Sequence, residues 1–271
     1  MPNKTIFTNV INSYLPEPHA SLLNGILFGV SLKTTPEFYQ QLKIVGLLHM
    51  VILSGINITI LSSIVSQITV FFSKKISILL TILVIIIFIF FVGPEAPILR
   101  AGFMGILTLV ATLLGRKSSS LWLLFFSLIP VSIFHFFYPK KITYLSTLLS
   151  YGATLGILLF LPKKKIRPKS LWEKVKTQIN SELNPSLAAQ IFTVPVIFIY
   201  FKQISLIAPL SNLLTSPFIP PLMVFGFLTA FLGKINFFLG LPFSFICFAI
   251  LEYLIFIINL LSQVPYAFIQ F

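Results

Sequence analysis

Polar and small residues interrupt one long apolar run near the start of the chain. Between Leu42 and Val65 the run contains Gly46, His49, Ser54, Gly55 and Asn57. An unpartnered polar side chain is costly inside a bilayer, so such residues usually face a bundle interior or a water-filled path. The Ser-Gly pair also favours a helix break, and free backbone groups are tolerated at membrane depth only within protein or beside a cavity. We therefore predict that these five residues line or gate a polar path. The alternative is a buried histidine and a kink that serve packing alone.

An arginine lies at the start of another apolar run. Arg100 follows the tight break Gly93-Pro94-Glu95-Ala96-Pro97, and proline suits the first position of a helix. The N-terminus of a helix carries partial positive charge and free N–H groups, so an arginine there calls for an anion. Two anions fit this position: the carboxylate of Glu95, in a structural ion pair, or a phosphate group of a ligand.

Prolines concentrate around a third polar residue, Asn212. Pro209 and Pro217 flank it, and Pro220-Pro221 follow. Prolines this dense interrupt a spanning helix, and discontinuous helices often line substrate paths. Asn212 could line such a path or could bond the carbonyls that Pro217 leaves free. At 1.5 Å per residue, His49, Arg100 and Asn212 would each lie within about 10 Å of the outer end of its helix.

Residues of the kinds used in catalysis and metal binding are few and scattered. The three histidines are His19, His49 and His135, and Cys247 is the single cysteine. This set contains no zinc-type ligand spacing. Gly233-Lys234 also lacks the spacing of a phosphate-binding loop. We therefore expect no catalytic residue, no metal and no cofactor, and we expect that the chain is not an enzyme.

The composition indicates the class of protein to which these residues belong. Hydrophobic residues make up 57% of the 271 positions and charged residues 9%, and the mean hydropathy is +1.01. Soluble domains carry about 25% charged residues. The chain is therefore predicted to be an all-α, polytopic membrane protein.

Apolar runs near the length of a spanning helix follow one another from residue 42 onward. We predict about eight transmembrane helices (seven to ten), some of them broken or re-entrant. The runs are Leu42–Phe72, Ile76–Val92, Ile98–Leu114, Leu121–Tyr138, Ile142–Leu161, Leu187–Phe201, Ile204–Leu232 and Phe237–Val264. Residues 1–41 form a separate outer-face region, in which Leu22–Leu32 is too short to span and suits a re-entrant or interfacial helix. Residues 42–271 form the transmembrane domain.

Basic clusters predict the orientation in the membrane. The formal net charge is +13, and the clusters at Lys74-Lys75, Arg116-Lys117, Lys163–Lys169 and Lys234 fall on one side if the runs cross alternately. The positive-inside rule makes that side cytoplasmic, although Lys140-Lys141 and Lys202 fall on the other. Residues 163–185 would form a basic cytoplasmic linker with an amphipathic helix over Ser170–Leu183, whose expected partner is membrane lipid.

Four motifs in this sequence resemble those of the ComEC competence-protein family. The central one resembles GLxHxxxxSGxH, with Asn57 where many members carry a second histidine, which argues against a mechanism that needs two titrating imidazoles. The segment LPxPxAxLLxGxLxG is matched at Leu15–Gly29, G-x(3-6)-RA at Gly93 and Arg100-Ala101, and PxxNLLxxP at Pro209–Pro217. The resemblance covers about Leu15–Gly233, the membrane competence domain alone.

The resemblance implies a channel that conducts single-stranded DNA across the inner membrane during natural transformation. It implies an outer DNA receptor and a cytosolic helicase-like ATPase as partners, and it allows separate chains for the nuclease and OB-type domains. Two other functions stay open. One is a small-molecule or ion transporter with His49 as a proton relay, and the other is a membrane scaffold whose polar residues only fix helix packing.

Overall fold

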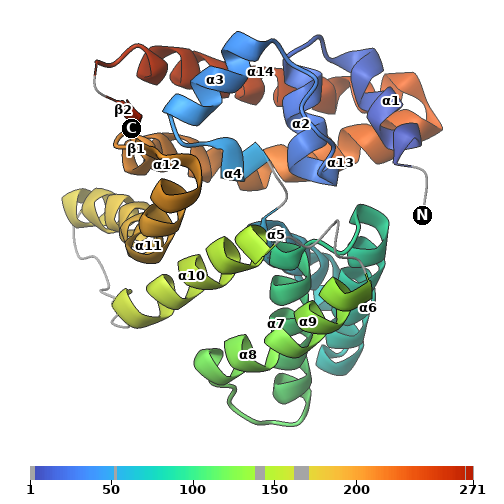
Figure 1. The fold of residues 1–271 in the computed structure, drawn as a ribbon. Helices are drawn as coiled ribbons and strands as arrows, with labels where there is room; N and C mark the ends of the chain where they lie inside the picture. Colours follow the sequence, from blue (N-terminus) through green and yellow to red (C-terminus); the bar gives the residue numbers. More distant parts are fainter. Residues whose placement is uncertain (1–3, 52–53, 138–143, 162–170, 266, 271) are drawn as a thin grey trace.

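The fold was obtained as a computed structural model, which describes the chain except for residues 1–3, 52–53, 138–143, 162–170, 266 and 271. Helices make up most of the described residues (Figure 1). The α-helices are α1 (Thr5–Tyr14), α2 (His19–Phe28), α3 (Pro36–Ile44), α4 (Leu48–Val51), α5 (Gly55–Ile68), α6 (Lys74–Val92), α7 (Ala96–Leu113), α8 (Ser120–Phe126), α9 (Leu128–Phe137), α10 (Tyr144–Phe160), α11 (Leu171–Phe201), α12 (Ala208–Thr215), α13 (Ile219–Ile235) and α14 (Phe237–Ser262). Two 3-10 helices, η1 (Thr69–Phe71) and η2 (Ser216–Phe218), and two short strands, β1 (Gln203–Ser205) and β2 (Phe268–Gln270), complete the described elements.

Six helical segments of the described chain are long and apolar enough to cross a membrane. They are Lys74–Val92, Ala96–Leu113, Ser120–Phe137, Trp172–Phe201, Ala208–Ile235 and Phe237–Ser262. Three further apolar helical segments are shorter: His19–Phe28, Gly55–Phe71 and Tyr144–Phe160. The prediction of a polytopic α-helical membrane protein is confirmed. Fewer segments reach full length than the eight predicted runs, because the structure divides the run 42–72 and gives the run 142–161 a helix of only 17 residues.

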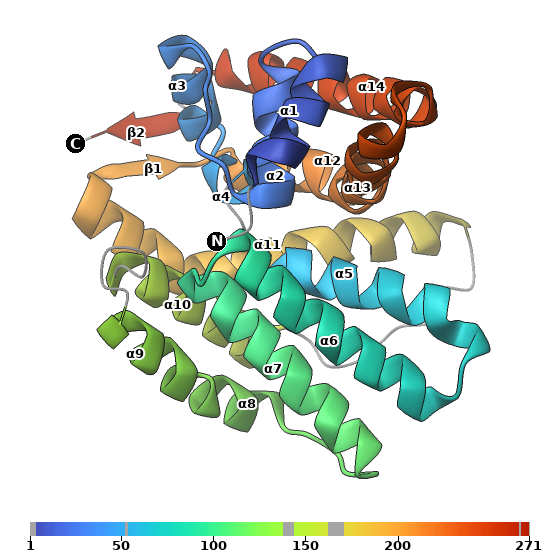
Figure 2. The same ribbon diagram turned by 90° about the vertical axis from the view of Figure 1, so that its right-hand side faces the viewer.

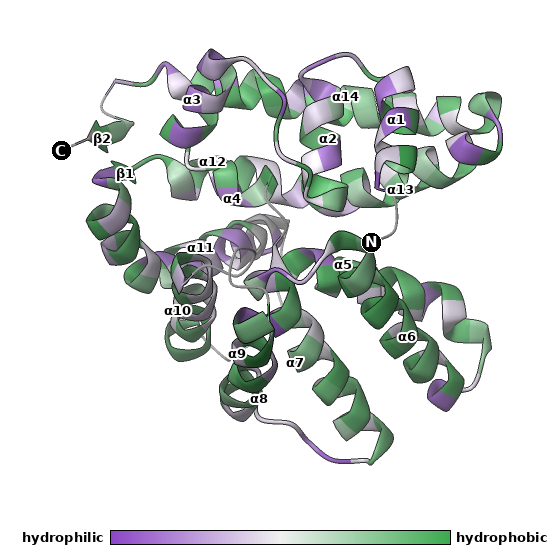
Figure 3. Cartoon of the chain, turned by 45° about the vertical axis from the view of Figure 1, so that its right-hand side comes forward, coloured by the Kyte–Doolittle hydropathy of each residue, from purple (hydrophilic) through white to green (hydrophobic). Residues whose placement is uncertain are grey.

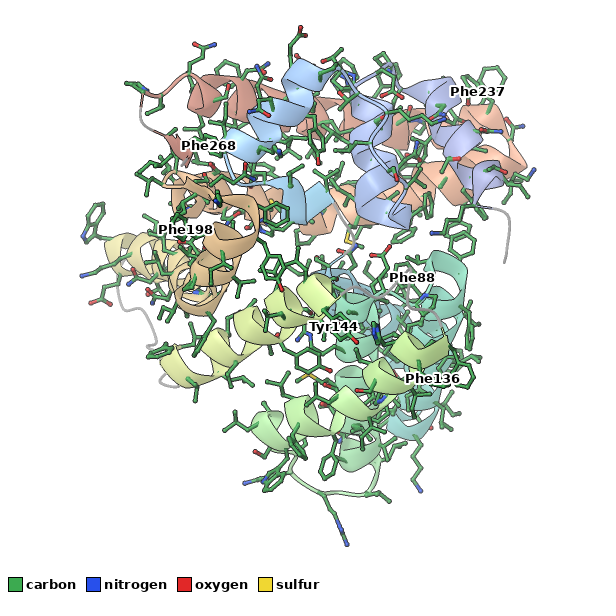
Figure 4. All side chains as sticks on the ribbon, viewed as in Figure 1. Phe88, Phe136, Tyr144, Phe198, Phe237 and Phe268 are labelled. Carbon is green, nitrogen blue, oxygen red and sulfur yellow. The ribbon has the colours of Figure 1, made fainter. Side chains whose placement is uncertain are left out.

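The helices form two groups that Figures 1 and 2 show one above the other. The first group contains α1 to α4 with α12, α13 and α14, and the second contains α5 to α10. Helix α11 packs along α10 of the second group and also contacts α12 of the first. Phe88 of α6, labelled in Figure 4, meets Phe227 of α13 edge to face with ring centroids 6.3 Å apart, which joins the two groups.

Helix α2 is enclosed by the first group. Every residue from His19 to Phe28 is buried, and the helix packs on α1, α4, α13 and α14. Small residues permit this close packing: a Cβ built at Gly25 would lie 2.8 Å from Cγ1 of Val51, and one built at Gly226 would lie 2.9 Å from Cδ1 of Leu23. The ten-residue length agrees with the prediction of a helix too short to span, and its side chains face other helices.

In the second group, the helices α6 and α7 are apolar along most of their length and hydrophilic at the end opposite their connection (Figure 3). Helices α6 and α7 are antiparallel neighbours, so Lys74 at the start of α6 and Arg116 after α7 lie at the same end (Figure 3). This placement agrees with the predicted grouping of these two basic clusters. Of the other basic positions in that prediction, Lys140-Lys141, Lys163–Lys165, Arg167 and Lys169 lie outside the described residues, whereas Lys202 and Lys234 are described.

Helix α11 is longer than the predicted run over Leu187–Phe201. It extends over 31 residues from Leu171 to Phe201, with Pro185 and Pro195 inside it. The described part of the predicted amphipathic segment is therefore the first half of a continuous helix. Trp172 is 77% exposed at its start, as expected for an aromatic residue near a membrane surface.

The proline-rich run 204–232 is helical from Ala208 onward, and the predicted interruption is limited to the 3-10 turn η2. It is divided into α12, η2 and α13, with Pro209, Pro217 and Pro220 each in the first turn of one of these elements. The predicted start of this run at Ile204 was wrong, because residues 203–205 form strand β1. Strand β1 pairs antiparallel with β2, and Ile204 faces Ile269 in the register. The pairing satisfies backbone groups that a helix start would have left free.

Candidate functional site

The helix break predicted at Ser54-Gly55 is present. Helix α4 ends at Val51, α5 begins at Gly55, and Ser54 between them has an extended backbone with φ −120° and ψ 166°. Residues 52 and 53 lie outside the described residues. The break places α4 and α5 in different groups of helices, so the segment from Ile44 to Asn57 connects the two halves of the fold (Figure 1).

His49 lies exposed on the short helix α4. Its Nδ1 is 2.9 Å from the carbonyl oxygen of Gly46, one turn earlier. A carbonyl only accepts hydrogen bonds, so Nδ1 must carry the proton in this contact, and Nε2 is left as an acceptor in the neutral ring. Gly46 has a φ of +73°, which glycine adopts without strain. The local turn therefore fixes the orientation of the imidazole.

The turn at Gly46 packs against the beginning of α12, the helix that carries most of the Pro209–Pro217 motif. A Cβ built at Gly46 would lie 2.6 Å from Cβ of Ala208, the first residue of α12. The Ser205 hydroxyl donates a 2.6 Å hydrogen bond to the carbonyl of Ile44, and the Thr215 hydroxyl lies 3.3 Å from Sδ of Met50. The central motif and the Pro209–Pro217 motif are therefore in direct contact.

Gly55 packs against the motif that contains Arg100 and Ala101. A Cβ built at Gly55 would lie 2.9 Å from Nη2 of Arg100 and 3.1 Å from Cβ of Ala101. The absence of a side chain at position 55 thus lets the start of α5 lie directly on α7. The central motif therefore contacts the Pro209–Pro217 motif through Met50 on one side of the break, and Arg100-Ala101 through Gly55 on the other.

The guanidinium of Arg100 is held by hydroxyl groups of α10. Its Nε donates to Oγ of Ser150 at 2.9 Å, its Nη1 donates to Oγ1 of Thr154, and its Cζ lies 6.0 Å from the ring centroid of Tyr151. Within the described residues, no ion pair joins Arg100 to Glu95, the residue that precedes the first turn of α7. The contacts of this half-buried cation are thus neutral, and the predicted structural ion pair with Glu95 is not formed.

Asn57 faces the first group of helices. It is 2% exposed, and its Nδ2 donates a 2.9 Å hydrogen bond to the carbonyl of Ile26 in the last turn of α2. The carbonyls in the last turn of a helix have no partner within the helix. The Ser54 hydroxyl lies 3.4 Å from Oδ1 of the same side chain. Asn57 therefore joins the break in the central motif to the C-terminus of α2.

Replacing Asn57 with alanine is expected to destabilise the protein by about 1–3 kcal/mol, because the buried carbonyl of Ile26 loses its donor. Thermal unfolding of the purified protein in detergent would measure this loss. The control is Ser54→Ala, which removes only the long 3.4 Å contact and should change the midpoint little. Equal midpoints for Asn57→Ala and the parent chain would show that the Asn57 bond contributes no stability.

Within the described residues, Asn212 and Pro217 make no hydrogen bond with Arg100. The Nδ2 of Asn212 donates to Oγ of Ser186 in α11 at 2.9 Å, and its buried Oδ1 finds no hydrogen-bond partner among the described residues. Pro217 is exposed in η2. The Asn212 amide thus bonds a side chain of a neighbouring helix, and not a carbonyl freed by Pro217.

The sequence analysis missed the residues of α10 that bind Arg100. Ser150, Tyr151 and Thr154 lie at positions i, i+1 and i+4 of an apolar run, a spacing that gathers polar groups on one helix face. That spacing was a detectable signal. For metals, no group of three or more His, Cys, Asp or Glu side chains gathers among the described residues.

Comparisons with known proteins agree with these motifs. ComE operon protein 3 of Bacillus subtilis (strain 168) is 24% identical over 210 residues, which cover 76% of this chain and 26% of that protein. The chain thus spans about a quarter of the length of this relative. No solved structure matches the chain. Residues 26–271 match the family described as Competence protein, and they include the helix break, Arg100 and the proline-rich helix. The chain is therefore a membrane protein that belongs to the Competence protein family.

Proposed function

We propose that this chain takes part in DNA uptake as a conduit for single-stranded DNA across the inner membrane. The observation that carries the proposal is the contact of two distant motifs, one at Arg100-Ala101 and one at Pro209–Pro217, with the central motif at Gly46–Asn57. Gly46 contacts Ala208, and Gly55 contacts Arg100. Membership of the Competence protein family supports the same role.

The chemistry around Arg100 suits a phosphate ligand. A single strand carries one negative charge per nucleotide, so a conduit needs cationic contacts that do not hold the polyanion tightly. Arg100 has hydroxyl and aromatic neighbours, and within the described residues no ion pair neutralises it. Its fork of N–H donors could exchange a hydroxyl for a phosphate oxygen at small cost, because both are hydrogen-bond acceptors.

His49 offers a second kind of contact. Its ring is exposed beside the break, and Nε2 is the nitrogen that the local turn leaves available. A neutral imidazole acceptor can contact the amino groups of bases without adding charge. The proposed conduit therefore combines one cation, which contacts the phosphate backbone of the strand, with neutral polar groups, which contact the bases.

The proposed conduit requires partners that this chain does not supply. We propose an outer DNA receptor for delivery and a cytosolic helicase-like ATPase for the pulling force, with nuclease and OB-type domains on the same or separate chains. In this proposal the chain carries out no chemical step of its own, and it needs no metal or cofactor.

Photocrosslinking of DNA halted during entry would test the conduit. Cells expressing the chain would take up DNA that carries diazirine-modified nucleotides and a bulky end group that blocks full passage. We expect crosslinked peptides from residues 46–57 and from the start of α7. The internal control is the exposed apolar face of α6, at Leu79, Leu83 and Phe90, which faces lipid in this proposal and should remain unlabelled. Crosslinks of equal yield on both surfaces would refute the proposed path.

A further inference from the structure

An apolar cavity lies between helices α8, α9, α10 and α11. Its volume is about 490 Å³, and its walls come from α8, α9, α10 and α11, with Leu124, Leu128, Leu155 and Phe192 among the lining residues. This volume falls within the range of small-molecule sites. Tyr151 brings the one polar side-chain group of the lining, and its hydroxyl is engaged with Oγ of Ser127 at 2.9 Å. The described lining of the cavity therefore offers no free polar side-chain group to water.

The mouth of this cavity is apolar and open. Leu121, Phe125, Leu128 and Leu148 line it and are between 38% and 61% exposed. Two of its walls, Ser120–Phe137 and Trp172–Phe201, are among the segments able to cross a membrane. In a bilayer such an opening faces hydrocarbon, and water does not fill an apolar space. An acyl chain of a lipid has the matching chemistry.

Cations lie at the α8 end of the cavity. Helix α7 ends at Leu113, Gly115 follows with a φ of +67°, and the N–H of Arg116 donates a 2.8 Å hydrogen bond to the carbonyl of Ala111. This terminating turn holds Arg116 and Lys117, both exposed, just before α8. Leu121, the first lining residue, lies four residues after Lys117, which is at most about 14 Å along the chain. A phosphate headgroup near this turn would leave its acyl chain within reach of the cavity.

We propose that this cavity is a binding site for an anionic phospholipid, with one acyl chain between α8, α10 and α11 and the headgroup at Arg116 and Lys117. The sequence analysis predicts that this basic cluster is cytoplasmic, and anionic lipid is concentrated in the cytoplasmic leaflet. Tyr151 lines the cavity, and its ring centroid lies 6.0 Å from Cζ of Arg100. A lipid at this site requires only the cavity and the basic turn, and its binding does not depend on passage of DNA.

Photoreactive lipids would test the site. The full chain would be reconstituted with phosphatidylglycerol that carries a diazirine in one acyl chain, and in parallel with the matching phosphatidylcholine. We expect phosphatidylglycerol to label residues 148–155 and 192–196 most strongly. The yield there should exceed the yield on the exposed face of α6. Gly152→Leu fills the cavity, since a Cβ there makes only an ordinary 3.4 Å contact with Cβ of Phe192. This variant should lower cavity labelling about tenfold, because the bound acyl chain would lose the burial of roughly two methylene groups.

Two controls keep the result interpretable. Leu159→Phe adds volume at an exposed position of α10 outside the cavity and should leave labelling unchanged. If Gly152→Leu does not fold, Leu148→Trp at the mouth replaces it. Arg116→Gln combined with Lys117→Gln should reduce phosphatidylglycerol labelling to the level of phosphatidylcholine. Labelling spread evenly over α6 and the cavity, or unchanged in the filled variants, would overturn the site. Equal labelling by both lipids in the parent chain would overturn the headgroup assignment.

Discussion

Replacing Arg100 with alanine is expected to reduce DNA uptake by about tenfold to a hundredfold, the range for losing a charged hydrogen bond in a poorly solvated site. The guanidinium lies against Gly55 at the helix break, and its described partners are the neutral groups of Ser150, Thr154 and Tyr151. Removing it therefore removes a cation that an incoming phosphate could contact, and leaves no described carboxylate unpaired. Arg100→Lys should retain part of the activity, because the charge survives without the bidentate fork.

Uptake of labelled DNA by cells that carry each variant would measure this effect, with membrane abundance measured alongside. Lys234→Ala removes an exposed cation far along the chain from this cluster and serves as the control. Single-stranded DNA should bind the purified parent chain more weakly as salt rises, with a shallower slope for Arg100→Ala. If the double variant Glu95→Gln with Arg100→Met restored both folding and uptake, Arg100 would have a structural role only, and the phosphate contact would be wrong.

Replacing His49 with alanine is expected to abolish uptake while the folded protein remains in the membrane. The imidazole is exposed at the break, and its described hydrogen bond is made to Gly46 within the same turn. Its loss should therefore cost little stability, unlike the loss of Asn57, which bonds a different helix. His49→Gln tests the role of the ring, because an amide keeps a donor and an acceptor but does not titrate near neutral pH.

Uptake and membrane abundance would again be compared, with His135→Ala as the control histidine. Activity of His49→Gln combined with inactivity of His49→Ala would assign hydrogen bonding to this position and exclude a proton relay. Inactivity of both variants, together with pH-dependent transport of a small solute by the parent chain, would favour the transporter alternative. Normal DNA uptake by His49→Ala would leave the central motif with a packing role alone.

The class of protein and the positions of the helix breaks could be predicted from the sequence. Both depend on local properties: apolar runs of spanning length, and glycine and proline at fixed positions. The break at Ser54-Gly55 and the divided helix around Pro217 are of this kind. The polar residues at membrane depth could also be identified, since Arg100 and His49 stand out within apolar runs. Their roles in DNA uptake remain predictions.

The partners of those residues were decided only by the tertiary structure. Arg100 bonds Ser150 and Thr154, which are 50 and 54 residues away, and not Glu95, its neighbour in the sequence. Asn57 bonds the end of α2, a helix that the sequence marked only as short and apolar. Periodicity shows which face of a helix is polar, but the helix that covers that face depends on how small residues such as Gly25, Gly55 and Gly226 let particular helices approach. Which helix covers a given face is decided by the packing of the whole chain. Each of these contacts joins segments far apart in the sequence, and the local pattern of one segment does not predict its partner.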